Sequence, residues 1–378
     1  IIPGDLSKNG EIESHKSFVK ELYKLKEAGK KIFVITAGHD YGEHSRAFVN
    51  NECIQVEGTP FKQLKELYND FGYSDAISVD ERTLSYVTEI SEGVRLLAIN
   101  CDSEGNPKGA VDERLMQWMQ VQLDDAKKTD SSVIAICHYP IIPSVPVFDL
   151  IGDAKLKHWR NVASFLADNG VKLVLTGHMH IQSVNKFVSE KGNELIDVCT
   201  SCLVGSPAKY RKIAVDSSTL DVKSIDVPDF GADMNGLTTQ EFFDRQFKYS
   251  IINRINGMFN GDGLLKKLGK KLVNGITVGG LGRLLFIKTD KSIRSRKFID
   301  LAGDIGVAIF KGDMPYVAGT PVGDAFSKVF KRLGFVLRKV EPKLSKNGVK
   351  VDLTDMLLNT IGNNKGYSDN NTAIEYKK

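Results

Sequence analysis

The chain of 378 residues contains few cysteines, only two tryptophans and no long apolar run. Its five cysteines are odd in number and do not have the clustering of a disulfide framework. Only the Cys199–Cys202 pair has the spacing of a redox motif, and because no second pair accompanies it, we interpret these two thiols as structural. No segment approaches the roughly 18 consecutive apolar residues that a membrane-spanning helix needs. A chain of this length with 42% hydrophobic residues can bury a large core, so we expect one large domain or two smaller ones.

The sequence also lacks a start signal. Its first residues, Ile1-Ile2-Pro3-Gly4-Asp5, are typical of the end of a buried strand and the loop that follows, without Met or a targeting segment. We therefore expect that the natural protein has further sequence upstream. The localisation in the cell is not predicted.

Charge is distributed unevenly along the chain. Residues 231–378 carry 25 basic and 14 acidic side chains, a net charge of +11, whereas the preceding part carries 26 basic and 33 acidic ones, a net charge of −7. The glycines are also concentrated there, with 17 of 34 from Gly257 onward. These shifts predict a first domain over residues 1–227 and a basic, Gly-rich, mostly helical C-terminal extension over residues 228–378.

Periodicity predicts an α/β fold for the first domain. Helical spacing alternates with short apolar runs, and later strands follow one another without helices, which is typical of two stacked sheets with helices outside. Helices are expected at 11–28, 61–69, 112–128 and 154–169, and strands at 31–35, 84–90, 94–100, 132–137, 171–175, 183–189, 194–199, 210–215 and 222–227.

Five side chains that can bind metals or move protons follow the ends of predicted strands: Asp5, His39, His138, His178 and His180. Parallel strands bring such loops to one edge of a sheet, where the sites of α/β proteins form. A carboxylate with several imidazoles suits one or two divalent metals, and two metals about 3.5–4 Å apart can hold a phosphoryl group and activate a bridging water. The Asp5 carboxylate suits the bridging position. A histidine outside the ligand set can protonate a leaving group, a role suited to His39.

These residues lie in ordered blocks. The segments Gly4-Asp5-Leu6-Ser7-Lys8-Asn9-Gly10-Glu11, Gly38-His39-Asp40, His138 and Gly177-His178-Met179-His180 resemble the motifs of the calcineurin-like metallophosphoesterase superfamily, over about residues 1–227. The resemblance implies a four-layer αββα sandwich with two stacked mixed sheets and a dinuclear metal site that hydrolyses phosphate esters.

The resemblance also assigns roles to single residues. It implies that Asp5 bridges the two metals, that His138 and His178 bind one of them, and that His180 binds the other. It further implies that His39 donates the proton. The metals are expected to be Zn, Mn or Fe, since all three accept these ligands.

Two departures from the family pattern affect this expectation. The family carries an Asp-x-His block before Gly4-Asp5 that this chain does not contain, so we expect the chain as printed to bind at most one metal well and to show little or no phosphoesterase activity. Gly38 stands where the family has a metal-binding Asn. Water or the Asp40 carboxylate can take its place; alternatively Asp40 is a hydrogen-bond partner of His39, the reading that we favour.

The predicted function is metal-dependent hydrolysis of a phosphodiester or phosphomonoester by a metal-activated water. The alternative is a degenerate member of the family that no longer turns over and acts as a binding module. In that case the basic amphipathic stretches at 263–273 and 326–340 would contact a membrane surface or a polyanion. We favour the simpler interpretation that these stretches are helices packed by their apolar faces, and we expect no specific nucleic-acid partner.

Overall fold

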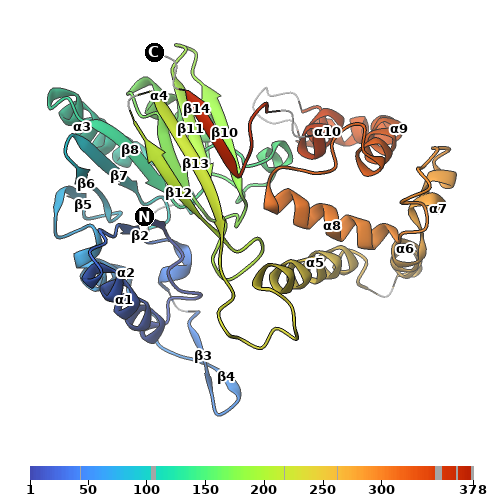
Figure 1. Ribbon diagram of the computed structural model, residues 1–378, viewed down its shortest axis with the longest axis horizontal. Helices are drawn as coiled ribbons and strands as arrows, with labels where there is room; N and C mark the ends of the chain where they lie inside the picture. The colour runs from blue at the N-terminus through green and yellow to red at the C-terminus, as the bar shows by residue number, and fades with distance from the viewer. Residues whose placement is uncertain are drawn as a thin grey trace.

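The computed structural model describes residues 1–42, 44–103, 108–216, 218–261, 263–344, 351–362 and 365–375. It has an α/β part formed by the first two thirds of the chain and a mostly helical C-terminal part beside it (Figure 1). The predicted fold class is therefore confirmed. Within the described ranges, no helix has the length and apolar composition that a membrane crossing requires.

The largest sheet has seven strands in the order β10-β11-β9-β8-β7-β6-β5. Its centre is parallel, since β7, β8, β9 and β11 run in the same direction, whereas β5, β6 and β10 are antiparallel to their neighbours. The carboxyl ends of β7, β8 and β9 consequently meet at one edge. The strands are β5 (Ala76–Asp80), β6 (Ser85–Ser91), β7 (Val94–Ile99), β8 (Ser132–Cys137), β9 (Leu173–Thr176), β10 (Ser183–Val188) and β11 (Glu194–Cys199).

Helices α3 (Glu113–Lys128) and α4 (Trp159–Asp168) cover one face of this sheet. Alternate strand residues such as Leu97 and Ile99 pack there against the apolar stripe of α3, in keeping with the two-residue period of a strand. The predicted cap of α3 is confirmed, because the Asp112 carboxylate accepts a hydrogen bond from the Leu115 amide at 2.9 Å.

The opposite face of the large sheet meets a second layer made of two small sheets. In the first, β1 (Ile2–Pro3) pairs in parallel with β2 (Val34–Ile35); in the second, β12 (Lys209–Val215) and β14 (Asn371–Glu375) flank β13 (Thr219–Asp226). Helices α1 (Ile12–Glu27) and α2 (Phe61–Leu67) share a core with β1 and β2. The expected four layers are present, but the second sheet is divided into a parallel and an antiparallel piece.

Smaller elements complete the α/β part. The hairpin of β3 (Arg46–Val49) and β4 (Glu52–Gln55) projects from the lower side of the view in Figure 1. In the described part of the chain, short 3₁₀ helices lie in three connections: η1 (Gly38–Asp40), η2 (Asn69–Phe71) and η3 (Pro146–Leu150).

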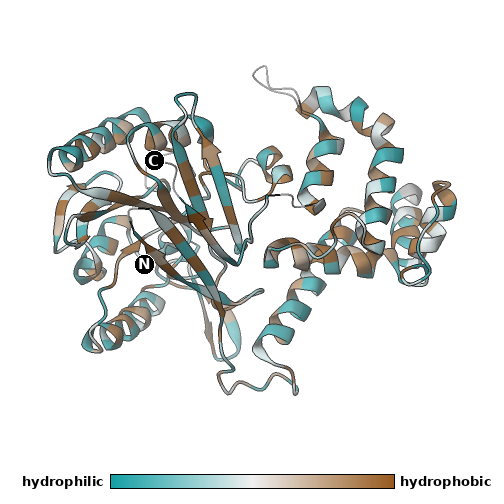
Figure 2. Cartoon of the chain, turned by 45° about the horizontal axis from the view of Figure 1, so that its top comes forward, coloured by the Kyte–Doolittle hydropathy of each residue, from teal (hydrophilic) through white to brown (hydrophobic). Residues whose placement is uncertain are grey.

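The C-terminal part is formed by helices with both apolar and polar faces (Figure 2). In α9, which contains the predicted stretch 326–340, the side chains of Phe326, Phe330 and Leu333 are half-buried while Lys331 and Arg332 are exposed. This pattern supports the packed-helix interpretation for α9. The helices are α5 (Thr239–Gly257), α6 (Leu264–Gly275), α7 (Val278–Leu284), α8 (Phe298–Lys311), α9 (Pro321–Leu344) and α10 (Leu353–Gly362).

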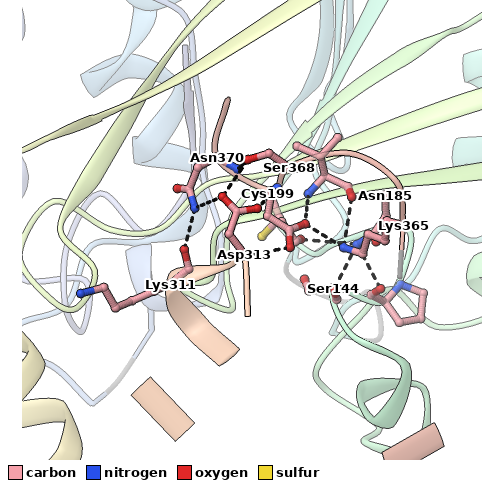
Figure 3. Close-up of polar contacts among 12 residues, drawn as sticks. Ser144, Asn185, Cys199, Lys311, Asp313, Lys365, Ser368 and Asn370 are labelled. Carbon is pink, nitrogen blue, oxygen red and sulfur yellow. Dashed lines mark hydrogen bonds and ion pairs between the residues drawn. The ribbon is translucent and has the colours of Figure 1, made fainter. Parts of the chain in front are cut away.

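The end of the chain returns to the α/β part. The composition after Gly362 favours a frayed tail, but this expectation is wrong for the described residues, because β14 pairs with β13. Just before it, the buried Asp369 carboxylate accepts hydrogen bonds from the Val184 amide at 3.0 Å and from Lys365 at 2.7 Å. Figure 3 shows this region, where Ser368 donates to Asp313 at 2.7 Å. The division at residue 227 stays a prediction.

Candidate metal centre

Three of the predicted ligands meet at the edge of the large sheet. His138 follows β8, His178 follows β9, and Asp5 follows β1 in the second layer. One ligand atom from each of these side chains lies within 4.8 Å of the other two. Among the described residues, this is the one cluster of three or more His, Cys, Asp or Glu side chains that could hold a metal ion. The Asp5 Oδ2 atom lies 3.2 Å from His138 Nε2, which in turn lies 3.1 Å from His178 Nδ1.

The other nitrogen of each imidazole is occupied by a backbone carbonyl. His138 Nδ1 donates to the Pro3 carbonyl at 2.7 Å, and His178 Nε2 donates to the Asp153 carbonyl at 2.7 Å. These contacts leave His138 Nε2 and His178 Nδ1 as the atoms with lone pairs, and both face the same point. Carbonyl contacts of this kind fix the tautomer of metal-binding histidines.

The charges of these groups favour a cation between them. Burial lowers the pKa of His138, but the hydrogen bond and charge of Asp5 outweigh it and raise the pKa to about 9. For His178, burial and the charge of His138 lower the pKa to about 4. In the absence of metal, a proton on His138 therefore balances the charge of the Asp5 carboxylate. A divalent ion at the same position would balance that charge and bind the lone pairs of His138 Nε2 and His178 Nδ1. The residues fit such an ion, because the buried Asp5 Oδ1 atom has no hydrogen-bond partner.

The backbone at the site is held in an unusual conformation. Asp5, His178 and His180 have φ angles of 55°, 61° and 53°, in the left-handed region that few residues other than glycine adopt. Non-glycine residues persist there when the surrounding structure demands it, which is common at functional sites. Gly4 has φ 90°, and a Cβ at this position would lie 2.8 Å from His138 Nδ1, so glycine is needed for Asp5 to approach His138.

His39 and His180 lie near this group but outside it. The His39 side chain is exposed, and its Nδ1 contacts the Lys8 carbonyl at 2.7 Å. Charge interactions connect both imidazoles with Asp5. The structure therefore brings together Asp5, His138 and His178, with His39 and His180 at their margin.

Asp40 has different partners from those predicted. Its buried carboxylate accepts hydrogen bonds from the Ala37 amide at 2.8 Å and from the Ser7 amide at 2.9 Å, and not from the His39 imidazole. Burial raises its pKa to about 7, and the charge of Asp5 acts in the same direction. Asp40 thus connects the loop that carries Asp5 with the loop that carries His39.

Sequence reasoning missed one residue of this region, Asp102. It follows β7, next to β8 in the sheet, and its side chain is only 3% exposed. Burial raises the pKa of its carboxyl, which interacts electrostatically with His138 and Asp5. Its position directly after the predicted strand 94–100 is the signal in the sequence that indicates this residue.

Residues 1–182 match the family of calcineurin-like phosphoesterases. A search of curated proteins gave no match.

Among solved structures, the chain is similar to a dimetal phosphatase from Danio rerio, with 11% identity and a TM-score of 0.41 over 60% of this chain and 81% of that chain. It is also similar to the purple acid phosphatase PPD1 from yellow lupin (Lupinus luteus) seeds, with 11% identity and a TM-score of 0.35 over 60% of this chain and 51% of that chain. The ligand cluster of Asp5, His138 and His178 lies within residues 1–182, the part of the chain that matches the calcineurin-like phosphoesterases.

Proposed function

We propose that this protein hydrolyses a phosphate ester in a metal-dependent reaction centred on Asp5, His138 and His178. The observation that carries the proposal is the convergence of the Asp5 carboxylate and two imidazole lone pairs, with the remaining imidazole nitrogens held by backbone carbonyls. When bound, one or two divalent ions (Zn, Mn or Fe) would supply a Lewis acid for the phosphoryl oxygens and lower the pKa of a water.

The surrounding residues support this reaction in distinct ways. His180 is the candidate ligand for a second ion, because its imidazole interacts with the charge of Asp5 from outside the first group. His39 is the candidate general acid. The Lys8 carbonyl accepts from Nδ1, so His39 acts as the acid in its doubly protonated form, which gives the Nε2 proton to the departing oxygen and keeps the Nδ1 proton. Asp40 acts as a positioning residue that holds the two loops.

The test is turnover after metal loading. The protein is stripped with a chelator, reloaded separately with Zn²⁺, Mn²⁺ or Fe²⁺, and assayed with chromogenic phosphomonoesters and phosphodiesters. We expect activity to return with metal and to be absent without it, and the preferred ester defines the substrate class. We expect no phosphoenzyme intermediate, and a phosphoenzyme trapped during turnover would contradict attack by water.

A second candidate function concerns α6, and one observation favours it. Leu268 and Leu272 are 53% and 54% exposed although they lie on the apolar side of a helix that also displays Lys267 and Lys271. An exposed apolar stripe bordered by lysines is typical of a helix that lies on an anionic membrane surface. Sedimentation with anionic and neutral vesicles tests it, with Leu268→Asp/Leu272→Asp as the variant; equal sedimentation with both vesicle types would reject it.

A further inference from the structure

Asp102 is fixed in place by the end of β7. Its backbone amide donates to the Asn100 side-chain oxygen at 3.1 Å, and the Asn100 amide group donates to Thr36 Oγ1 at 3.0 Å. Asn100 therefore connects the end of β7 with the segment after β2. As a result the Asp102 carboxylate lies beside Gly38, between the loop that precedes His39 and the loop that carries His138.

Gly38 is needed to make room for this carboxylate. The Gly38 amide donates a hydrogen bond to it, and a Cβ at position 38 would overlap Asp102 Oδ2 and lie 3.1 Å from its Cγ. Any side chain at position 38 would occupy the same space. The position of Gly38 and the position of the Asp102 carboxylate thus depend on each other.

One oxygen of this carboxylate is left without a partner. Asp102 Oδ1 is buried and accepts no hydrogen bond within the described part of the chain, as is also true of Asp5 Oδ1. A buried carboxylate oxygen without a partner is strongly unfavourable, and it signals either a bound cation or a strained site. The Asp5 and Asp102 carboxylates both interact electrostatically with His138. Their two negative charges equal the charge of one divalent ion.

We propose that Asp102 is a metal ligand, and that its carboxylate uses the space left by Gly38 to complete a four-residue donor set with Asp5, His138 and His178. Asp102 lies outside the group whose ligand atoms are within 4.8 Å of one another, so the proposal requires its side chain to turn toward the ion while its anchored backbone stays in place. Asp5, His138, His178 and Asp102 would supply the four protein ligands that a Zn²⁺ ion takes, without a side chain at position 38; Mn²⁺ would need further ligands such as water.

This inference rests on the metal-dependent hydrolysis proposed above, but its test does not use substrate. Metal binding to the chelator-stripped full chain is measured by titration calorimetry with Zn²⁺ or Mn²⁺ alone. We expect Asp102→Ala to weaken binding by about tenfold or more. The matched control is Asp75→Ala, an exposed carboxylate on the far edge of the sheet, which we expect to bind as the parent does.

A second variant distinguishes a ligand from a structural carboxylate. Gly38→Ala retains Asp102 but introduces the Cβ that displaces it, so we expect a similar loss of affinity. The double variant Gly38→Ala/Asp102→Ala should then bind no more weakly than Asp102→Ala. In the metal-free state, Asp102→Ala should unfold at the same or a higher temperature than the parent, because it removes a buried unpartnered oxygen, while the thermal shift on adding metal decreases.

Asp102→Asn keeps the shape of the side chain and serves if the alanine variant does not fold. With Co²⁺ as the probe, it should change the visible absorption spectrum of the bound ion, since the spectrum reports the ligand set. The inference is overturned if Asp102→Ala binds Zn²⁺ and Mn²⁺ as tightly as the parent, or if Asp102→Asn leaves the Co²⁺ spectrum unchanged. Loss of turnover in a variant with unchanged metal binding would also count against it, while leaving the proposed function intact.

Discussion

At the scale of single residues, the chemistry of the centre depends on which nitrogen of each histidine is free. The carbonyls of Pro3 and Asp153 each occupy one imidazole nitrogen, and so both lone pairs face the Asp5 carboxylate. Because these carbonyls belong to the backbone, they hold the imidazoles whatever side chains surround them. The site is therefore preorganised to bind a cation.

His178→Ala should lose metal and activity together. The substitution removes one of two lone pairs, and we expect at least about a tenfold loss of metal affinity, as found when metal-site partners are removed. Metal content and phosphatase activity of the dialysed protein measure both. The control is His158→Asn, since Asn tolerates the left-handed backbone at that exposed position. Retained metal in His178→Ala would remove His178 from the ligand set.

His39→Ala should keep its metal and lose turnover. His39 lies outside the group of three, so the ligands remain, but the departing oxygen loses its proton donor. We expect turnover to fall by about 10²–10⁴-fold for a poor leaving group. An aryl phosphate with an acidic phenol needs less protonation and should lose much less. An equal loss with both esters would mean that His39 does not act as the general acid.

The residues of the centre differ in how far the sequence could predict them. His138 and His178 stand directly after apolar strands, so the order of strands and loops was enough to bring them together. Asp102 also follows a predicted strand, but its closeness to Gly38 depends on space that only the folded backbone reveals. The partners of Asp40 were mispredicted for a related reason: backbone amides of two loops compete with the imidazole for its oxygens.

At the scale of elements, periodicity predicted the α/β part well. Strong amphipathic or apolar patterns gave α1, α3 and the central strands nearly to their ends. Polar strands cannot be predicted from such patterns, because they contain no apolar run. β14 contains Asn371 and Thr372 and is defined by its pairing with β13, a contact with residues about 150 positions earlier that no local pattern encodes.

A buried carboxyl between elements should make stability depend on pH. Asp197 in β11 accepts hydrogen bonds from Thr176 Oγ1 at 2.6 Å and from the Ile142 amide at 2.8 Å. Burial raises its pKa from 3.8 to about 7, so between these values the folded state binds a proton that the unfolded state has released. The free energy of unfolding should therefore fall as pH rises through this window, by up to about 4 kcal/mol.

Asp197→Asn isolates this effect. The Asn oxygen can accept from Ile142 and its amide can donate to the Thr176 hydroxyl, so the variant should fold. Denaturant unfolding of the metal-free protein from about pH 4 to about pH 7 should show a smaller fall in stability than in the parent. Asp40 shifts in the same direction, so part of the dependence remains. Parallel curves for the two proteins would show that Asp197 does not titrate in this range.

At the scale of the whole molecule, two parts of opposite net charge lie beside each other. The part up to residue 230 carries a net charge of −7 and the rest +11. Specific polar contacts, rather than net charge, join them. The Asp369 carboxylate accepts a hydrogen bond from the Val184 amide at 3.0 Å, and Ser224 Oγ donates to the Asn370 carbonyl at 2.9 Å. Within the C-terminal part, the Asn370 amide donates to the Lys311 carbonyl at 2.9 Å and to Asp313 at 2.9 Å (Figure 3). The segment 365–370 is thus the junction between the C-terminal helices and the large sheet.

Asp369→Ala should weaken this junction without affecting the metal centre. The substitution leaves the Val184 amide and the Lys365 ammonium without the carboxylate that they contact, which is expected to lower the free energy of unfolding by about 1–3 kcal/mol. Calorimetric unfolding measures the loss, and limited proteolysis should cut the chain faster near residues 365–370, because the segment detaches more often. The control is Asp221→Ala, at a half-buried carboxylate in β13. Metal affinity and turnover of a small ester should stay at the parent values, since Asp369 touches none of the ligands. If stability and proteolysis were unchanged, the C-terminal segment would be held by the pairing of β14 with β13 alone.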